Sequence, residues 1–200
     1  MERRQSTPPD QETNQILWAP NGPERHLLQI RAAQPADEPG LERMFFRLSP
    51  RTLYFRFLLP LPVAAHQAYL VTQLARVEHR ASYAAVACEG EEIRGIARYD
   101  PEPVPATVEL SLLIEDAWQG RGLGKALASQ MIIEALRHGI TQLTVTIQGE
   151  NVPALRLVKA LFPQAQFVWN EGIWQASLSA ETTEARPKRP TDGQGCSVDR

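Results

Sequence analysis

The amino-acid sequence predicts an α+β fold in which a mixed β-sheet carries helices. Short runs rich in β-branched and apolar residues recur along the chain, for example TVELSLLI at 107–114 and QLTVTIQ at 142–148. Other segments repeat apolar residues every three or four positions, which is the spacing of an amphipathic helix. The turn signal EGEE at 89–92 separates two strand-like runs. Hairpins and strand–helix–strand connections are therefore both expected.

The first half of the chain supplies one strand followed by helices. HLLQIRAA, residues 26–33, is the first strand. A helix through Leu48 follows, with Asp37 as its expected N-cap. Its apolar residues lie on one face: Leu41, Met44, Phe45 and Leu48. Further helical stretches are expected from Ser49–Pro50 onward and over 64–77.

The second half alternates strands and helices. YAAVACEG at 83–90 and IRGIARYD at 93–100 form an expected antiparallel hairpin, and a Pro-rich loop leads into the strand at 107–114. A long amphipathic helix covers Lys125–His138, and Gly139 supplies its stop signal.

The strand at 142–148 comes next. Asn151 then caps a helix that has Pro153 in its first turn. The helix has the buried face Ala154, Leu157, Val158 and Leu161. A strand pair over 165–179 closes the fold.

Composition narrows the class of protein. The 200 residues are 43% hydrophobic and 22% charged, which suits one globular domain with flexible ends. A net charge of −2 gives no basic field for nucleic acid, and the four His residues lack the spacing of metal ligands. No apolar run reaches the length of a membrane span, and the first residues lack the apolar core of a signal peptide. The two cysteines, one in an apolar run and one in a polar stretch, predict a reducing compartment. We expect a cytoplasmic protein with no metal.

Three regions are predicted from composition. Residues 1–25 and 180–200 are rich in Pro, Thr, Glu and Arg, and are expected to be a flexible N-terminal tail and a disordered C-terminal tail. The folded domain is expected over 26–179. The apolar cluster ILW at 16–18 is an exception within the first tail, and packing against the domain is its expected role.

The most informative stretch is the glycine turn between the strand at 107–114 and the long helix. Gly120, Gly122 and Gly124 occupy every second position there. Glycines allow left-handed backbone angles and a close approach of N–H groups to a ligand. The helix that follows directs its positive dipole end at the same place. The turn therefore favours a phosphate-bearing ligand, although a glycine-rich connection without a ligand stays open from these letters alone.

Familiar phosphate motifs do not fit these letters. A Walker loop needs Gly where the chain has Gln119, and Ser or Thr where it has Ala126. Dinucleotide and kinase loops require G-x-G-x-x-G, which neither Gly120 nor Gly122 begins. The pattern that remains is Q-x-x-G-x-G, filled by Gln119, Gly122 and Gly124.

This pattern resembles the acyl-CoA pyrophosphate loop of the GNAT N-acyltransferase superfamily. The segments LSPRTLYFRF at 48–57, VEHRASYAAVA at 77–87 and VELSLLIEDAWQGRGLGKAL at 108–127 resemble the acyltransferase domain of Pat-type protein lysine acetyltransferases. Over about 27–178, the resemblance implies a three-layer α/β/α arrangement, with a mainly antiparallel sheet and helices on both faces. It also implies transfer of acetyl from acetyl-CoA to protein lysines, notably on acyl-CoA synthetases.

The resemblance also implies cofactor-binding residues. A backbone N–H of the strand before the turn is expected to stabilise the oxyanion. Asn151 resembles a residue that helps to hold pantetheine, although a plain helix cap explains it equally well. Val158 stands where many relatives have Tyr, which leaves the existence of a general acid open. The expected cofactor site consists of Leu112, Leu113, Ile114, Gln119, Gly120, Arg121, Gly122, Leu123, Gly124, Lys125, Asn151 and Ala154.

Glu109 is the expected general base. In a regular strand it shares one face with Ser111 and Leu113, and a carboxylate in so apolar a strand is costly unless it is hydrated, paired or used in chemistry. An ion pair with Arg98 is the alternative from spacing alone. Pat-like sequences carry Glu nine residues before the Trp that precedes the glycine loop, and Glu109 stands in that relation to Trp118.

Neighbouring acidic residues have smaller expected roles. Glu78 is a secondary candidate for the base. Glu115 and Asp116 are expected to be solvated, since they would repel an anionic cofactor if they pointed inward.

Two kinds of function stay open at this point. The first is an N-acetyltransferase that acts on a protein lysine or on a small amine. The second is a noncatalytic acyl-CoA-binding module. The sequence does not identify the acceptor, the preferred acyl chain or the oligomeric state.

Overall fold

The computed structural model describes residues 16–18, 27–58, 71–72, 74 and 82–182. The strands are β1 (Ile16–Trp18), β2 (Leu28–Ala32), β3 (Tyr83–Glu89), β4 (Glu92–Pro101), β5 (Thr107–Ile114), β6 (Gln142–Gln148), β7 (Gln166–Asn170) and β8 (Ile173–Ser179). The principal helices are α1 (Glu38–Phe46), α2 (Pro50–Phe57), α4 (Leu123–Arg137) and α5 (Val152–Leu161).

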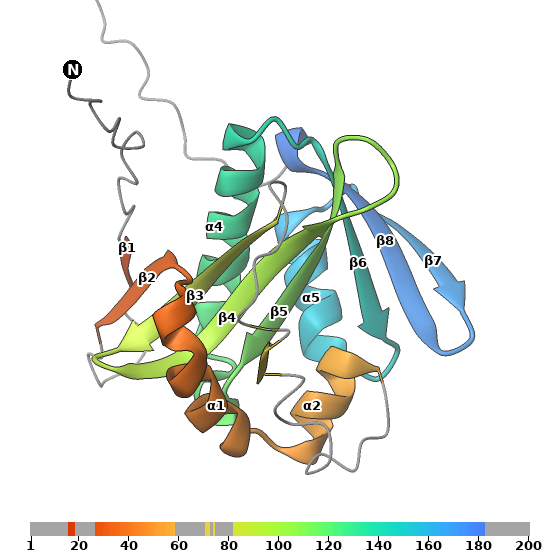
Figure 1. Cartoon of the computed structure of the whole chain (residues 1–200). Coiled ribbons are helices and arrows are strands. Elements are labelled where there is room, and N and C mark those ends of the chain that lie inside the picture. Colours follow the sequence, from red (N-terminus) through yellow and green to blue (C-terminus); the bar gives the residue numbers. More distant parts are fainter. Residues whose placement is uncertain (1–15, 19–26, 59–70, 73, 75–81, 183–200) are drawn as a thin grey trace, which may run out of the picture.

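The strands form one mixed sheet in the order β1-β2-β3-β4-β5-β6-β8-β7 (Figure 1). β5 and β6 pair in parallel, and the other pairings are antiparallel. The expected hairpin at 83–100 is present as β3 and β4. The predicted α+β fold with a mixed, mainly antiparallel sheet is confirmed.

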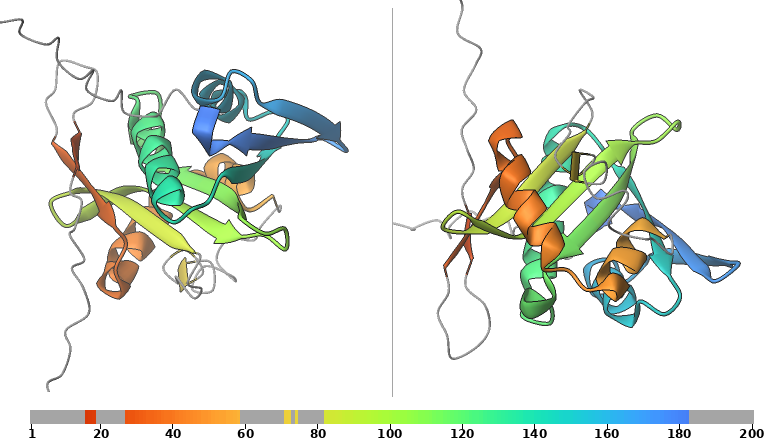
Figure 2. Two further views of the ribbon diagram at one scale, coloured as in Figure 1. Left: turned by 90° about the horizontal axis from the view of Figure 1, so that it is seen from above. Right: turned by 60° about the horizontal axis from the view of Figure 1, so that its bottom comes forward.

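Helices cover both faces of the sheet, and each face has its own apolar core. α1 and α4 lie on opposite sides of the sheet in the left view of Figure 2. Leu113 of β5 belongs to the cluster beneath α1 and α2, whereas Val108 and Ile114 pack with α4 and α5. This confirms the expected alternation of side chains along β5 and places Glu109 and Ser111 on the α2 side.

Asp37 does not cap α1 through its side chain, contrary to the prediction. Its carboxylate instead accepts two hydrogen bonds from the Arg31 guanidinium, at 2.6 and 2.8 Å, and one from the Gln34 N–H at 2.8 Å. Burial acts to raise the pKa of Asp37, but these hydrogen bonds outweigh it and hold the pKa below its usual value. Asp37 therefore binds the Arg31 guanidinium and not the free N–H groups of α1, although its side chain is suited to capping.

Two other helices have side-chain caps, and the cap at Asn151 was predicted. The Ser49 hydroxyl accepts a hydrogen bond from the Thr52 N–H at 3.2 Å and caps α2. Asn151 Oδ1 accepts from the Ala154 N–H at 3.2 Å and caps α5. Most of the helical stretch expected over 64–77 lies outside the described residues.

The folded region reaches further than 26–179 at both ends. β1 lies within the segment expected to be a tail and pairs antiparallel with β2. Beyond β8, a short 3-10 turn spans Ala180–Thr182, and Ala180 is fully buried. Strand pairing and burial, rather than composition, set these boundaries.

One feature of the sheet determines where a ligand can enter. β5 and β6 pair over only three positions, Thr107–Glu109 with Gln142–Thr144. β5 then continues to Ile114 and β6 to Gln148 as the two strands diverge (Figure 1). The fold therefore opens between the carboxyl ends of two parallel strands.

Candidate active site

The glycine turn connects β5 to α4 at the mouth of this opening. A 3-10 turn over Asp116–Trp118 follows β5, and α4 begins at Leu123. Gly120 and Gly122 have φ values of 71° and 93°, a left-handed region that side-chain-bearing residues rarely adopt. A Cβ at Gly124 would lie 3.3 Å from Leu112 Cδ2, so this glycine lets the helix approach β5 closely.

The turn borders a cavity of about 660 Å³. The first N–H groups of α4 have no partner within the helix, and the positive end of the helix dipole lies at the same point. An anionic group is favoured there. Predicted cofactor residues that line this cavity are Leu112, Leu113, Ile114, Gln119, Gly120, Gly122, Gly124, Lys125, Asn151 and Ala154.

Two residues of the predicted cofactor set do not line this cavity. The Arg121 guanidinium lies over the Trp118 ring, 5.3 Å from its centroid. The Leu123 side chain is fully buried in the core beneath α4. Neither side chain forms part of the cavity wall in this structure.

A second cavity, of about 320 Å³, lies where β5 and β6 diverge. Leu110 of β5, Ile147 of β6 and Val158 of α5 contribute to its largely aliphatic wall, and Glu109 lies at its edge. The two cavities have several lining residues in common, which are Phe55, Arg56, Leu112, Asn151, Ala154 and Leu157. They adjoin, and together they lead from the glycine turn to Glu109.

Glu109 is exposed, so its carboxylate is hydrated, which is one of the three conditions that make it tolerable in so apolar a strand. Asp100 lies directly opposite it on β4. Arg98 donates to the Asp100 carboxylate, with 2.7 Å between Nε and Oδ2, and the alternative ion pair of Arg98 with Glu109 is not found among the described residues. Within the described part of the chain, no hydrogen bond or salt bridge reaches the Glu109 carboxylate. It is left accessible at the edge of the cavity.

Arg56 is a site residue that the sequence did not reveal. It lies half-buried on α2, lines both cavities, and donates to Ser111 Oγ at 3.1 Å. Burial lowers the pKa of Arg56, with a further contribution from Arg98, while Glu109 and Asp100 act in the opposite direction. The side chain therefore adds a positive charge close to the two carboxylates.

No helix in the described ranges has the length and apolar character needed to cross a membrane.

The model of the acetyltransferase (GNAT) family matches residues 49–161, which include α2, the glycine turn and the whole of α5. The chain belongs to this family. The acyl-CoA loop resemblance of Q-x-x-G-x-G therefore identified the correct family.

Relatives in sequence and structure agree with this assignment. An acetyltransferase from Pseudomonas aeruginosa is 35% identical over 123 residues, which are 60% of this chain and 64% of the relative. The chain thus spans about two thirds of the length of that curated relative.

Among solved structures, the GNAT domain of S. lividans PAT matches with a TM-score of 0.66 at 21% identity, covering 76% of this chain and 90% of that domain. RimL, a ribosomal alpha-N-protein acetyltransferase solved with coenzyme A, matches with a TM-score of 0.60 at 13% identity, covering 76% and 93%. At these identities the similarity shows the GNAT fold.

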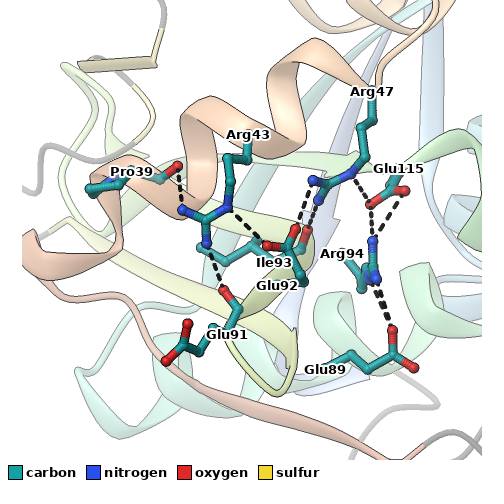
Figure 3. Close-up of polar contacts among 9 residues, drawn as sticks. All are labelled: Pro39, Arg43, Arg47, Glu89, Glu91, Glu92, Ile93, Arg94 and Glu115. Atoms are coloured by element: carbon teal, nitrogen blue, oxygen red, sulfur yellow. Dashed lines mark hydrogen bonds and ion pairs between the residues drawn. The ribbon is translucent and has the colours of Figure 1, made fainter.

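Glu115, expected to be solvated, is buried just before the GNAT glycine turn. Its carboxylate pairs with Arg94 Nη1 and Arg47 Nε, both at 3.1 Å. Figure 3 shows that these arginines continue into a network of alternating charges with Glu89 and Glu92. The Arg94 guanidinium also lies 5.6 Å from the centroid of the Trp118 ring. The network fixes the segment that enters the turn and neutralises the Glu115 charge.

Replacing Glu115 with glutamine should lower the free energy of unfolding by about 2–4 kcal/mol, because two partly buried arginines lose a shared anion. Urea denaturation at neutral pH measures the change. Glu92→Gln is the matched control, since Glu92 also pairs with two arginines but its side chain is 34% exposed, against 8% for Glu115. The control should lose about 1 kcal/mol or less. Equal losses in the two variants would contradict a special role for the buried pair.

Proposed function

We propose that this protein is an acetyl-CoA-dependent N-acetyltransferase whose acceptor is a protein lysine. The observation that carries the proposal is the continuous path from the glycine turn, through the β5–β6 opening, to an accessible carboxylate at Glu109. Along this path lie an anion site, then an unpaired strand edge, then a proton acceptor. This order suits a long thioester substrate that is attacked by an amine. Membership of the GNAT family supports the same chemistry.

The chain offers separate groups to separate parts of acetyl-CoA. In the turn from Gln119 to Lys125, the backbone N–H groups after Gln119 and one lysine side chain face the pyrophosphate, because the Gln119 N–H itself donates to the Asp116 carbonyl. The edge of β5 at Leu112–Ile114 lies beyond the last β6 pairing, so its backbone groups can hydrogen-bond the pantetheine amides. Asn151 Oδ1 is occupied by the helix cap, which leaves the Nδ2 amide to contact the substrate.

The reaction requires a neutral amine and a stabilised oxyanion. Free lysine has a pKa of about 10.4, so a proton must be removed before attack on the thioester carbonyl. In our proposal Glu109 accepts that proton, directly or through water, and a backbone N–H within Leu112–Ile114 donates to the oxyanion. The C–S bond then breaks, the sulfur leaves as a thiolate, and the extra proton on the new amide nitrogen passes to that thiolate or to water. A thiol has a pKa of about 8.5, so departure requires no general acid, which fits the aliphatic Val158 in the cavity wall.

The glycine turn gives the first test. A Gly122→Glu, Gly124→Glu variant should bind acetyl-CoA at least about 100-fold more weakly by isothermal titration calorimetry, because it adds strain, bulk and negative charge beside the pyrophosphate. Gly90→Glu is the control, since Gly90 also has a positive φ of 59° but lies in the β3–β4 turn. The control should bind normally. Wild-type affinity in the folded double variant would remove the turn from the binding site.

Glu109 gives the second test. Glu109→Gln keeps the shape of the side chain and should lower turnover by about 10²–10⁴-fold, most severely near neutral pH, while acetyl-CoA binding is unchanged. Glu42→Gln, which alters an exposed carboxylate on α1, should turn over at the wild-type rate. If Glu109→Gln keeps near-wild-type turnover from about pH 6 to 9, another base such as Glu78 is required. Glu78 lies outside the described residues.

The acceptor gives the third test. Incubation with acetyl-CoA and a cytoplasmic lysate, read by acetyl-lysine mass spectrometry, should reveal specific protein targets. The resemblance to Pat-type enzymes predicts that a folded acyl-CoA synthetase is acetylated faster than polyamines, aminoglycosides or free amino acids. Turnover of one small amine with no protein modified would favour a small-amine acetyltransferase. Binding of acetyl-CoA with no turnover on any amine would favour a noncatalytic acyl-CoA-binding module.

A further inference from the structure

Asp116 connects the entrance of the glycine turn to the N-terminus of α2. Its carboxylate accepts hydrogen bonds from the Ser49 N–H at 2.9 Å, the Ser49 hydroxyl at 2.7 Å and the Thr52 hydroxyl at 2.8 Å. Burial acts to raise the pKa of Asp116, but the bonds from Ser49 and Thr52 hold it below its usual value. The carboxylate is therefore ionised at neutral pH and interacts favourably with the positive end of the α2 dipole.

Gln119 forms a second connection to the same helix. Its Nε2 amide donates to Thr52 Oγ1 and to the Ile114 carbonyl, each at 3.1 Å. An amide nitrogen has two hydrogens to donate, and both are used by protein groups. In this arrangement the Gln119 side chain joins β5 to α2, and a phosphate in the turn would be bound by other groups.

The other end of α2 contacts the opposite part of the site. Phe55 and Arg56 line both cavities, and Arg56 donates to Ser111 in the middle of β5. The helix is thus joined to the β5 segment at two places, near the glycine turn and near Glu109. It forms one wall along the whole path between them.

We propose that Thr52 and Asp116 are positioning residues that make the glycine turn and the α2 wall a single unit. A pyrophosphate bound in the turn then restrains Phe55 and Arg56 at the acceptor end, although neither residue needs to touch the phosphates. The proposal rests on the proposed acetyl-CoA site at the turn. Through α2, binding of the cofactor at the glycine turn then fixes the positions of the side chains around Glu109.

Thr52→Val and Thr52→Ser form a matched pair that tests this role. Valine keeps the shape of the side chain but removes the hydroxyl that donates to Asp116 and accepts from Gln119, whereas serine keeps the hydroxyl. Thr141→Val, located between α4 and β6, is a control for loss of a threonine hydroxyl elsewhere. Titration calorimetry first establishes that each variant binds acetyl-CoA.

Hydrogen exchange of the α2 amides, with and without saturating acetyl-CoA, is the main readout because it requires no acceptor. In the wild type, Thr52→Ser and Thr141→Val, acetyl-CoA should slow exchange over 55–58 by about 10-fold or more. In Thr52→Val, acetyl-CoA should still bind, but this protection should largely disappear. Equal protection in Thr52→Val and the wild type would overturn the proposal, as would a wild type that binds acetyl-CoA without protecting α2.

Kinetics give an independent readout with the acceptor identified by mass spectrometry. At saturating acetyl-CoA, Thr52→Val should lower kcat/KM for the acceptor about 10-fold, and Thr52→Ser should restore it. Unchanged acceptor kinetics in Thr52→Val would show that the hydroxyl only stabilises the fold, and would overturn the proposal. If the wild type binds no acetyl-CoA, the proposed function fails instead, so the two failures are distinguishable.

Discussion

The divergence of β5 and β6 after three paired positions is the constraint on which the rest of the site depends. Each strand keeps its antiparallel partner on the other side, β4 for β5 and β8 for β6, so the sheet stays intact around the opening. Backbone groups along the inner edges lose their pairing, and an unsatisfied polar group in a cleft costs about 1–3 kcal/mol. A water or ligand that supplies hydrogen bonds is therefore favoured there. The glycine turn, α2 and α5 each border this one opening.

Much of the fold was predictable because its signals are local. The strand at 142–148, the helix start at Ser49–Pro50 and the cap at Asn151 follow from residues within a few positions of one another. Asp37 and Glu115 illustrate where such prediction ends. The spacing of Asp37 is correct for a cap, but Asp37 pairs with Arg31. Glu115 is buried and pairs with Arg47, which directly follows α1, and with Arg94 of β4. Only the folded chain brings these partners together.

The candidate site also contains some residues that local sequence patterns predict and others that they do not. Most residues of the glycine turn line one cavity, and they lie together because a strand–turn–helix unit is contiguous in sequence. Arg121 and Leu123 belong to that unit but direct their side chains to Trp118 and to the core. Arg56 and Thr52 reach the site from more than 50 residues earlier in the chain, with Thr52 bonded to Asp116 over a separation of 64 residues. Their contribution follows from how α2 lies across β5, which no local pattern encodes.

The N-terminal part of the chain, which its composition predicts to be a tail, contains the strand that covers one edge of the sheet. A sheet edge with unpaired N–H and C=O groups is a template for association with other chains. β1 covers that edge of β2, whose Leu28 and Ile30 side chains are buried. A protein shortened to begin at residue 26 would keep every residue of the proposed site but would expose the β2 edge. The exposed β2 edges of two such molecules would pair with each other, so the shortened protein would aggregate even though its proposed site is complete.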